Sequence, residues 1–259
     1  MCLLVLAWQV HPRYRLVVAA NRDEFHDRPS APLGHWSIGA SEILGGRDLR
    51  AGGTWLALDA RRRFGVVTNY RDLARSHPDA PSRGVLVPQF LAGQADPGSY
   101  LAALEGEAGR YSGFNLLLSD ATTLWYAGNR ATPFARPLAP GIHALSNHLL
   151  DTPWPKLARV RRAFEAWIDA DPTPPIEALL AMLADRTPAS ADEALPETGL
   201  APEWERVLSA PFVLDPRYGT RSSTLVLLEP SGAGLFFERR FDAEGRASGD
   251  SACTLEASA

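Results

Sequence analysis

Apolar residues along this chain come in short runs, and the runs form pairs separated by brief polar turns. Such runs, bounded by Gly, Pro, Asn or Asp, are typical of β-hairpins. The sequence predicts four hairpins, formed by residues 3–10 with 16–20, 55–59 with 64–69, 114–118 with 124–127, and 224–228 with 234–240. Helical spacing of apolar residues predicts helices between these pairs, at residues 85–91, 99–108, 154–170 and 176–184.

The order of these elements indicates the fold class. Strand pairs that alternate with groups of helices favour antiparallel sheets covered by segregated helices, and not a parallel sheet of βαβ units. The sequence also contains no Gly-rich phosphate loop of either standard type. We therefore expect an α+β protein in which residues 1–259 form a single domain, with a polar surface loop at 186–202.

Composition narrows the function classes. The 259 residues are 46% hydrophobic and 22% charged, with a formal net charge of −4, so neither nucleic acid nor an anionic membrane surface is an expected partner. No apolar run approaches the roughly 20 residues of a membrane span, and the apolar N-terminal segment lacks the charged start of a signal peptide. Because the only two cysteines lie at opposite ends of the chain, we expect a cytoplasmic protein without disulfides.

The second residue is the first candidate for chemistry. Removal of Met1 would leave Cys2 with a free α-amino group beside its thiol. An unperturbed α-amine has a pKa of roughly 7.7–8.0, so near neutral pH part of it is uncharged and can accept the thiol proton. An N-terminal residue that is nucleophile and base at once is a known form of covalent catalysis. The alternative is a cysteine that simply continues an apolar strand.

The first hairpin predicts which residues lie near Cys2. If its turn is centred near Pro12, paired positions sum to 24 or 25, and Cys2 lies opposite Arg22 or Asp23. These residues belong to a polar cluster, Asn21-Arg22-Asp23-Glu24, at the end of the second strand. An adjacent guanidinium favours a thiolate, and a carboxylate can hold the α-amine. The alternative is a polar strand end that carries a weak, solvated ion pair.

Several motifs occur in order along nearly the whole chain: Asn21 to Glu24, Gly52-Gly53-Thr54-Trp55-Leu56, Thr68-Asn69-Tyr70, Gly113-Phe114-Asn115-Leu116, Leu145-Ser146-Asn147 and Tyr218-Gly219-Thr220-Arg221. Together they resemble the NRDE family, also called the transport and Golgi organisation protein 2 family. That family is similar to N-terminal nucleophile (Ntn) hydrolases. The resemblance therefore implies a four-layer αββα sandwich of two antiparallel sheets flanked by helices.

Among Ntn hydrolases the pattern is most similar to the cysteine group that contains choloylglycine hydrolases and penicillin V acylase. That resemblance implies that Cys2 is the nucleophile and that Arg22 and Arg221 are the arginines of the site. It further implies that Asn69 is the oxyanion donor and Asn147 the second asparagine. The site acid departs from the group's spacing, which leaves both Asp23 and Glu24 open; Asn21, Glu24 and Tyr70 are expected to contact substrate.

Two functions follow from the resemblance. The first is a hydrolase that cleaves an amide or thioester of a small acyl compound through Cys2. The second is a non-catalytic binding or trafficking protein for a hydrophobic ligand such as haem or acyl-coenzyme A. No cofactor is expected, and the six histidines match no standard metal-site spacing. Taken singly, Asn69, Asn147 and Arg221 are also consistent with turn residues or buried hydrogen-bond anchors.

Overall fold

The computed structural model describes residues 3–72, 79–170, 175–190 and 193–257. The chain forms two compact units. Unit 1 comprises Met1–Asp27, Pro140–Ser146 and Leu150–Ala259, and unit 2 comprises Arg28–Ala139 and Asn147–Leu149. Each unit is built around its own antiparallel sheet.

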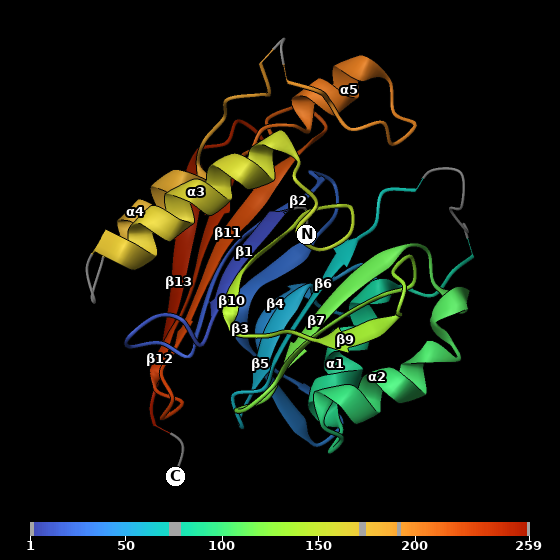
Figure 1. The fold of residues 1–259 in the computed structure, drawn as a ribbon, viewed down its shortest axis with the longest axis vertical. Helices are drawn as coiled ribbons and strands as arrows, with labels where there is room; N and C mark the ends of the chain where they lie inside the picture. The colour runs from blue at the N-terminus through green and yellow to red at the C-terminus, as the bar shows by residue number, and fades with distance from the viewer. Residues whose placement is uncertain (1–2, 73–78, 171–174, 191–192, 258–259) are drawn as a thin grey trace. The chain divides into compact units, whose positions relative to one another are not determined.

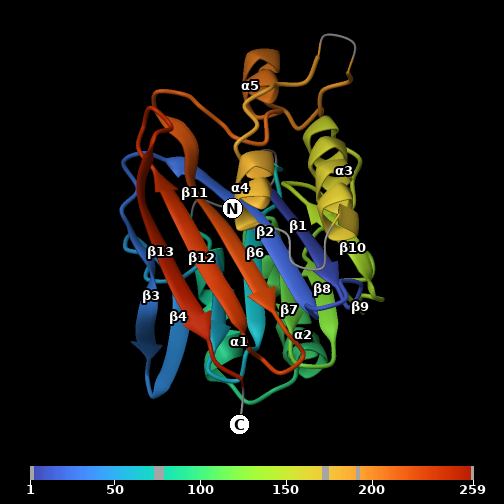
Figure 2. The same cartoon turned by 90° about the vertical axis from the view of Figure 1, so that its left-hand side faces the viewer.

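Unit 1 contains a six-stranded sheet in the order β10-β1-β2-β11-β12-β13 (Figures 1 and 2). The strands are β1 (Leu3–Trp8), β2 (Leu16–Phe25), β10 (Gly141–Leu145), β11 (Tyr218–Leu228), β12 (Gly234–Phe241) and β13 (Ala247–Leu255). Helices α3 (Pro155–Ala170) and α4 (Ile176–Leu183) lie side by side across one face of this sheet (Figure 1). The short helix α5 (Pro202–Val207) stands beyond the ends of β2 and β11 (Figure 2).

The core of unit 1 follows from strand alternation. Leu3, Val5 and Ala7 point to the face covered by the two long helices, where they pack with apolar side chains of α3 and α4. Leu4 and Leu6 point to the other face and are also fully buried. Burial on both faces explains why β1 is a continuous apolar run and shows no polar alternation.

Unit 2 contains a seven-stranded sheet in the order β3-β4-β5-β6-β7-β8-β9. The strands are β3 (Ser30–Ile38), β4 (Ser41–Asp48), β5 (Leu56–Asp59), β6 (Phe64–Asn69), β7 (Phe114–Ser119), β8 (Leu124–Gly128) and β9 (Ala135–Pro137). Helix α1 (Leu86–Ala92) packs on β4, β5 and β6, and α2 (Pro97–Glu105) packs on β8 and β9. Short 3₁₀ turns, η2 (Arg83–Val85) and η3 (Ala108–Arg110), flank these helices.

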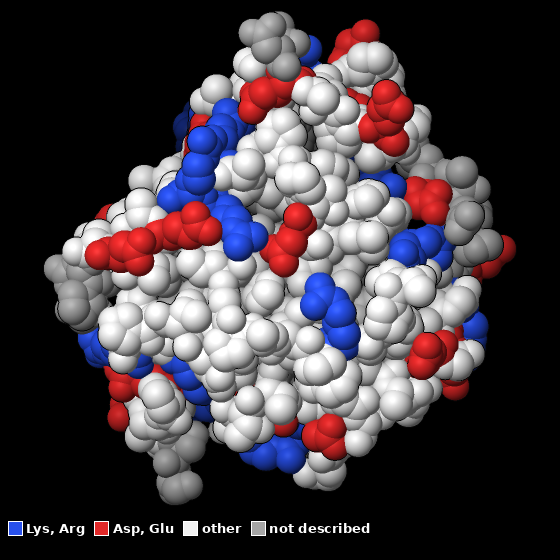
Figure 3. All heavy atoms as spheres, viewed as in Figure 1, with Lys and Arg blue, Asp and Glu red and all other residues white. Residues whose placement is uncertain are grey.

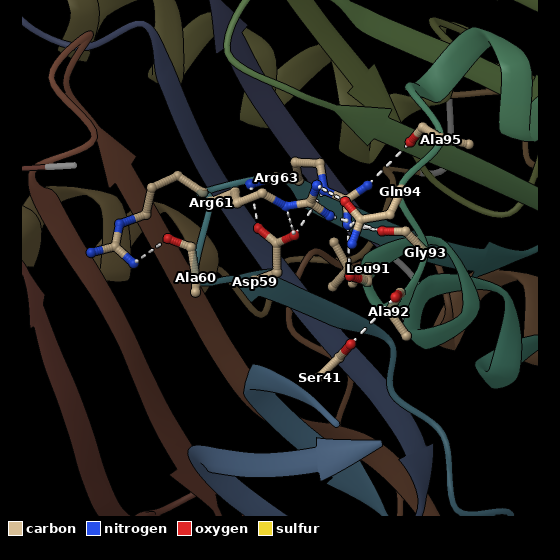
Figure 4. Close-up of polar contacts among 11 residues, drawn as sticks. Ser41, Asp59, Ala60, Arg61, Arg63, Leu91, Ala92, Gly93, Gln94 and Ala95 are labelled. Carbon is tan, nitrogen blue, oxygen red and sulfur yellow. Dashed lines mark hydrogen bonds and ion pairs between the residues drawn. The ribbon is translucent and has the colours of Figure 1, made fainter. Parts of the chain in front are cut away.

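A buried arginine joins the β5–β6 turn to the C-terminal end of α1 (Figure 4). Arg63 donates from Nε to Asp59 Oδ2 at 2.7 Å and from its terminal nitrogens to the carbonyls of Leu91, Gly93 and Ala95. Its guanidinium also lies 4.7 Å from the centre of the Phe90 ring. A cation at this point satisfies carbonyls that the helix end leaves unpaired. Arg63 therefore holds α1 against the sheet of unit 2.

All four predicted hairpins are confirmed, because β1 pairs with β2, β5 with β6, β7 with β8 and β11 with β12. The α+β class with two antiparallel sheets and packed helices is also confirmed. The described part of 186–202 has no helix or strand before α5 begins at its last residue. The predicted helices are present with shifted ends; α2, for example, begins at Pro97, where Asp96 caps it by accepting from Ser99 N.

Two strands are longer than predicted. Strand β2 does not end before the polar cluster but continues through Phe25, and β11 begins at Tyr218 rather than near residue 224. The cluster thus forms the last part of β2, and the alternative of a solvated strand end is wrong for Asn21, Arg22 and Asp23, which are buried. The reason is that β2 and β11 pair along this whole stretch, so polar residues from one strand meet polar residues from the other.

No helix among the described residues is long and apolar enough to cross a membrane. On the face of the molecule shown in Figure 3, acidic and basic side chains are interspersed, and the residues drawn in colour form no extended basic area there. This distribution agrees with the slightly negative net charge.

Candidate functional site

The first hairpin fixes what lies beside the start of β1. Leu3 pairs with Asn21 and Leu4 with Ala20, so paired positions sum to 24, one of the two predicted registers. Cys2 lies outside the described residues. On the far side of β2, Arg22 pairs with Ser222 and Asp23 with Thr220 of β11. The polar cluster thus begins at Asn21, the partner of Leu3, and lies on β2 between the neighbouring strands β1 and β11.

Strand alternation divides the polar cluster between the two faces of the sheet. Asn21 is the cross-strand partner of Leu3, which belongs to the core beneath α3 and α4, so Asn21 and Asp23 lie on the helix-covered face. Arg22 and Glu24 lie on the opposite face, where an Arg22 nitrogen is 3.8 Å from a Glu24 carboxylate oxygen. The two candidate acids therefore point to different faces, and only Glu24 shares a face with Arg22.

Asn21 is tied into unit 1 by its side-chain amide. It is fully buried, and Nδ2 donates to the carbonyls of Leu183, at the end of α4, and Pro211, at 2.8 and 2.9 Å. Its Oδ1 accepts from the Ser223 hydroxyl at 2.6 Å. These bonds use both amide donors. Asn21 therefore anchors the last turn of α4 and the 211 segment to the centre of the sheet.

Asp23 is held by a buried threonine. The Thr220 hydroxyl donates to Asp23 Oδ1 at 2.7 Å and accepts from Val213 N at 2.9 Å. Asp23 is 3% exposed and Thr220 1% exposed, so this relay lies away from water. Hydrogen bonds to a buried carboxylate are among the stronger ones in proteins. The relay connects β2, β11 and the segment before β11.

Arg221 occupies an irregularity of the β2–β11 ladder. The register shifts between Thr220 and Ser222, which leaves Arg221 as the extra residue of a β-bulge. Its Nη1 donates to the carbonyls of Phe25 and His26 at 3.2 and 2.9 Å. The predicted late arginine thus lies next to the polar cluster and closes the end of β2.

Two hydroxyls that the sequence analysis did not single out share the face of Arg22. Ser222 pairs with Arg22, and Thr224 pairs with Ala20. Both residues are buried, at 3% and 2% exposed, and neither hydroxyl has a hydrogen-bond partner among the described residues. Buried hydroxyls without partners are unusual and call for a ligand or an ordered water. The available signal was the run Ser222-Ser223-Thr224 directly before the apolar, buried residues Leu225–Leu228 of the same strand.

In unit 2, two predicted asparagines are in direct contact. Asn69 ends β6, and its carbonyl accepts from Asn147 Nδ2 at 3.0 Å. The Asn147 carbonyl accepts from Arg71 N at 2.8 Å, which closes the loop onto the strand end. Asn147 is buried, whereas Asn69 is exposed and its side-chain amide makes no hydrogen bond with another described residue. Asn69 therefore has a free donor, and Asn147 fixes its backbone.

Tyr70 and His148 continue this cluster. Their rings lie 5.0 Å apart in a tilted arrangement, and burial lowers the pKa of His148 below its ordinary value. The His148 carbonyl accepts from Asn115 Nδ2 at 2.9 Å, and Asn115 in turn accepts from the Tyr126 hydroxyl at 2.7 Å. Asn115 was recognised only as part of a motif; the structure gives it the role of positioning the 147–149 segment.

The predicted residues thus fall into two groups. Asn21, Arg22, Asp23, Glu24 and Arg221 come together in unit 1, and Asn69, Tyr70 and Asn147 come together in unit 2. Among the residues that the structure describes, no group of three His, Cys, Asp or Glu side chains could hold a metal ion.

The Asp23–Thr220 relay makes a testable prediction about stability. Thr220→Val should lower the free energy of unfolding by about 2–4 kcal/mol, because it takes the hydroxyl acceptor from the buried Val213 amide and the hydroxyl donor from the buried Asp23 carboxylate. Ser222→Ala removes a buried hydroxyl from the same strand that has no partner among the described residues, and should be neutral or slightly stabilising. Urea titrations followed by circular dichroism compare the two. Equal losses would show that the relay has no special role.

Comparisons with solved structures show which folds this chain resembles. A C2A mutant of the conjugated bile acid hydrolase from Clostridium perfringens superposes with a TM-score of 0.55 at 8% identity, covering 98% of this chain and 92% of that one. The Caenorhabditis elegans ortholog of N-acylethanolamine-hydrolyzing acid amidase gives a TM-score of 0.51 at 10% identity, covering 88% and 93%. The fold is therefore Ntn-hydrolase-like, as the resemblance implied.

Sequence comparison gives the family. Residues 1–243 match the model of the Transport and Golgi organisation 2 family. The mouse Transport and Golgi organization 2 homolog is 36% identical over 258 residues, and its human counterpart is 34% identical, each alignment covering 92% of both chains. The Drosophila melanogaster protein is 26% identical over 267 residues. The chain belongs to the Transport and Golgi organisation 2 family, which confirms the resemblance seen in its motifs.

Proposed function

We propose that this protein is a cysteine hydrolase of the Ntn type, which cleaves an amide or thioester bond with Cys2 as nucleophile. The observation that carries the proposal is the face of β2 and β11 that presents Arg22, with the Ser222 and Thr224 hydroxyls buried beside it. Leu3, which follows Cys2, pairs with Asn21, which precedes Arg22. This register supports a position of the Cys2 thiol next to the face that carries Arg22. The bile acid hydrolase of similar fold was crystallised with alanine in place of a cysteine at position two.

The proposed reaction runs in two halves. The Cys2 thiolate attacks the substrate carbonyl carbon, forming a C–S bond and a tetrahedral oxyanion. Collapse of that intermediate breaks the C–N or C–S bond, and the α-ammonium group of Cys2 donates its proton to the leaving amine or thiol. The α-amine then takes a proton from water, whose oxygen attacks the carbonyl carbon of the acyl-enzyme. The bond between that carbon and the Cys2 sulfur breaks, a carboxylic acid leaves, and the α-ammonium group returns its proton to the sulfur.

Arg22 and Glu24 have separate proposed roles. The Arg22 guanidinium lowers the pKa of the thiol by stabilising the thiolate. Glu24, on the same face as Arg22, is the better placed of the two candidate acids to hold the α-ammonium group. Asp23 lies on the other face and is engaged by Thr220, which supports a role in positioning the strand. In this proposal Arg221, which donates to the carbonyls of Phe25 and His26, keeps the end of β2 in place.

Thiol reactivity tests the proposal without knowledge of the substrate. Cys2 and Cys253 are alkylated with iodoacetamide at pH 7, and peptide mass spectrometry follows each site. Cys253, on β13, is the internal control, and Cys2 should react faster. Arg22→Gln should lower the alkylation rate of Cys2 by about threefold to thirtyfold. The reason is that the thiol pKa rises, and the resulting loss of thiolate outweighs the higher nucleophilicity of the thiolate that remains.

The matched control is Arg13→Gln. Arg13 is an exposed arginine that pairs with Glu229, and it lies in the turn after β1, at the opposite end of that strand from Leu3. The substitution should leave both rates unchanged. The proposal fails if Cys2 reacts no faster than Cys253 in the wild type, or if the Arg22 and Arg13 variants behave alike.

The carrier alternative makes a different prediction. One feature of unit 1 favours it, namely an apolar pocket at the end of β2 and β11 that the proposed reaction does not use. A carrier of haem, acyl-coenzyme A or another hydrophobic ligand would keep saturable binding in a Cys2→Ala variant. A hydrolase would lose turnover in the same variant.

A further inference from the structure

Unit 1 contains a pocket of about 370 Å³ between α5 and the ends of β2 and β11. Its lining comes from three segments: the end of β2, the start of β11 with the residue before it, and the α5 region. The lining residues are Phe25, Leu200, Trp204, Leu208, Arg217 and Tyr218. The volume lies within the range of small-molecule sites. Figures 1 and 2 both show α5 standing over this end of the strands.

The lining is apolar and aromatic although it is open to solvent. Phe25 is 54% exposed, and its ring meets that of its strand partner Tyr218 edge-on at 5.2 Å. Trp204, Leu200 and Leu208 are each only partly buried. Five large apolar or aromatic side chains around one hollow leave much hydrophobic surface in water, which is unfavourable unless an apolar ligand covers it.

One positive charge lies at this pocket. The Arg217 guanidinium carbon is 5.9 Å from the centre of the Trp204 ring, and the Arg217 side chain makes no ion pair with any described residue. The nearby carboxylate of Asp215 accepts from the Arg217 backbone N–H, and Glu205 of α5 is buried and bonded to Thr198. Arg221 is turned toward the carbonyls of Phe25 and His26. Arg217 therefore keeps its fork of donors available for an anion.

We propose that this pocket binds an apolar carboxylate, with its alkyl or aryl body among Phe25, Trp204 and Leu208 and its carboxylate on Arg217. A planar guanidinium recognises a carboxylate through two parallel hydrogen bonds. Phe25 has the strand parity of Asp23, so its side chain belongs to the face opposite Arg22. The pocket is therefore a binding site separate from the proposed nucleophile, and it does not depend on hydrolysis.

Calorimetric titration of the full chain with three ten-carbon probes tests the proposal. Decanoate, decanol and decylamine share one apolar body and differ in charge, and all are used below their micelle concentrations. Decanoate should bind saturably, and at least tenfold more tightly than decylamine. Arg217→Gln should reduce the preference for decanoate over decanol by about tenfold, since a charge-assisted hydrogen bond is lost.

Leu208→Asp places a negative charge in the pocket and should abolish decanoate binding, because it repels the carboxylate and removes an apolar contact. Leu214→Asp is its control, because Leu214 is 45% exposed and does not line the pocket. Cys2→Ala should leave decanoate affinity unchanged, which separates this site from the proposed reaction. The proposal is overturned by absent decanoate binding, by equal affinities for the three probes, or by equal effects of the Leu208 and Leu214 variants.

Discussion

Replacing Cys2 with alanine is expected to reduce hydrolysis of acyl amides and thioesters by roughly 10³-fold or more. The reason is that the substitution removes the atom that forms the acyl-enzyme, and loss of a nucleophile costs more than loss of any group that assists it. The measurement is kcat/KM across a panel of N-acyl amines and acyl thioesters of increasing chain length. Circular dichroism of the variant should match that of the wild type.

Cys253→Ala is the matched control, since it removes the only other thiol of the chain. It should keep full activity, because Cys253 lies on the edge strand β13, and two strands, β11 and β12, separate it from β2 and the polar cluster. Equal activity of the Cys2 variant and the wild type would refute the nucleophile and favour the carrier.

Arg63→Ala is expected to lower the free energy of unfolding by about 3–5 kcal/mol, the range for removing one partner of a buried ion pair. Arg63 and Asp59 are both about 5–6% exposed, and four acceptors each lose a hydrogen bond from the Arg63 side chain: Asp59 and the carbonyls of Leu91, Gly93 and Ala95. The end of α1 would lose its anchor to β5 and β6 (Figure 4). Urea-induced unfolding followed by circular dichroism measures the loss.

Arg61→Ala is the control for this prediction. Arg61 also contacts Asp59, at 3.4 Å, but its side chain is 48% exposed. An exposed ion pair contributes at most about 1 kcal/mol. If the two variants lost the same stability, the burial of Arg63 would not be the source of its effect.

Local sequence pattern predicted the hairpins because their turns are short. The polar residues between 10 and 16 set the register of β1 on β2 to within one residue, and the structure gives a sum of 24. The strands that were missed have weak patterns for a physical reason. Strand β13 is an edge strand that is mostly exposed, and β3 is half-exposed and interrupted by glycine and proline, so neither shows an apolar run.

The sequence predicted which residue types form the candidate site, but not which face of the sheet each of them lies on. Asn21 and Asp23 are buried because Ser223 and Thr220, about two hundred positions away, satisfy them. No local pattern reveals such partners, so a solvated strand end remained open as the alternative to a functional cluster. The β-bulge at Arg221 could not be predicted from the sequence either, since it arises only from the pairing of β11 with β2. The contact of Asn147 with the Asn69 carbonyl depends on a similar long-range closure.

The most direct test of the central claim is intact-mass spectrometry of the purified protein after brief incubation with an excess of an acyl thioester. The account predicts a chain without Met1 that carries one acyl group, and peptide mapping should place that group on Cys2. A chain that retains Met1, or an acyl group found equally on Cys253, would contradict it.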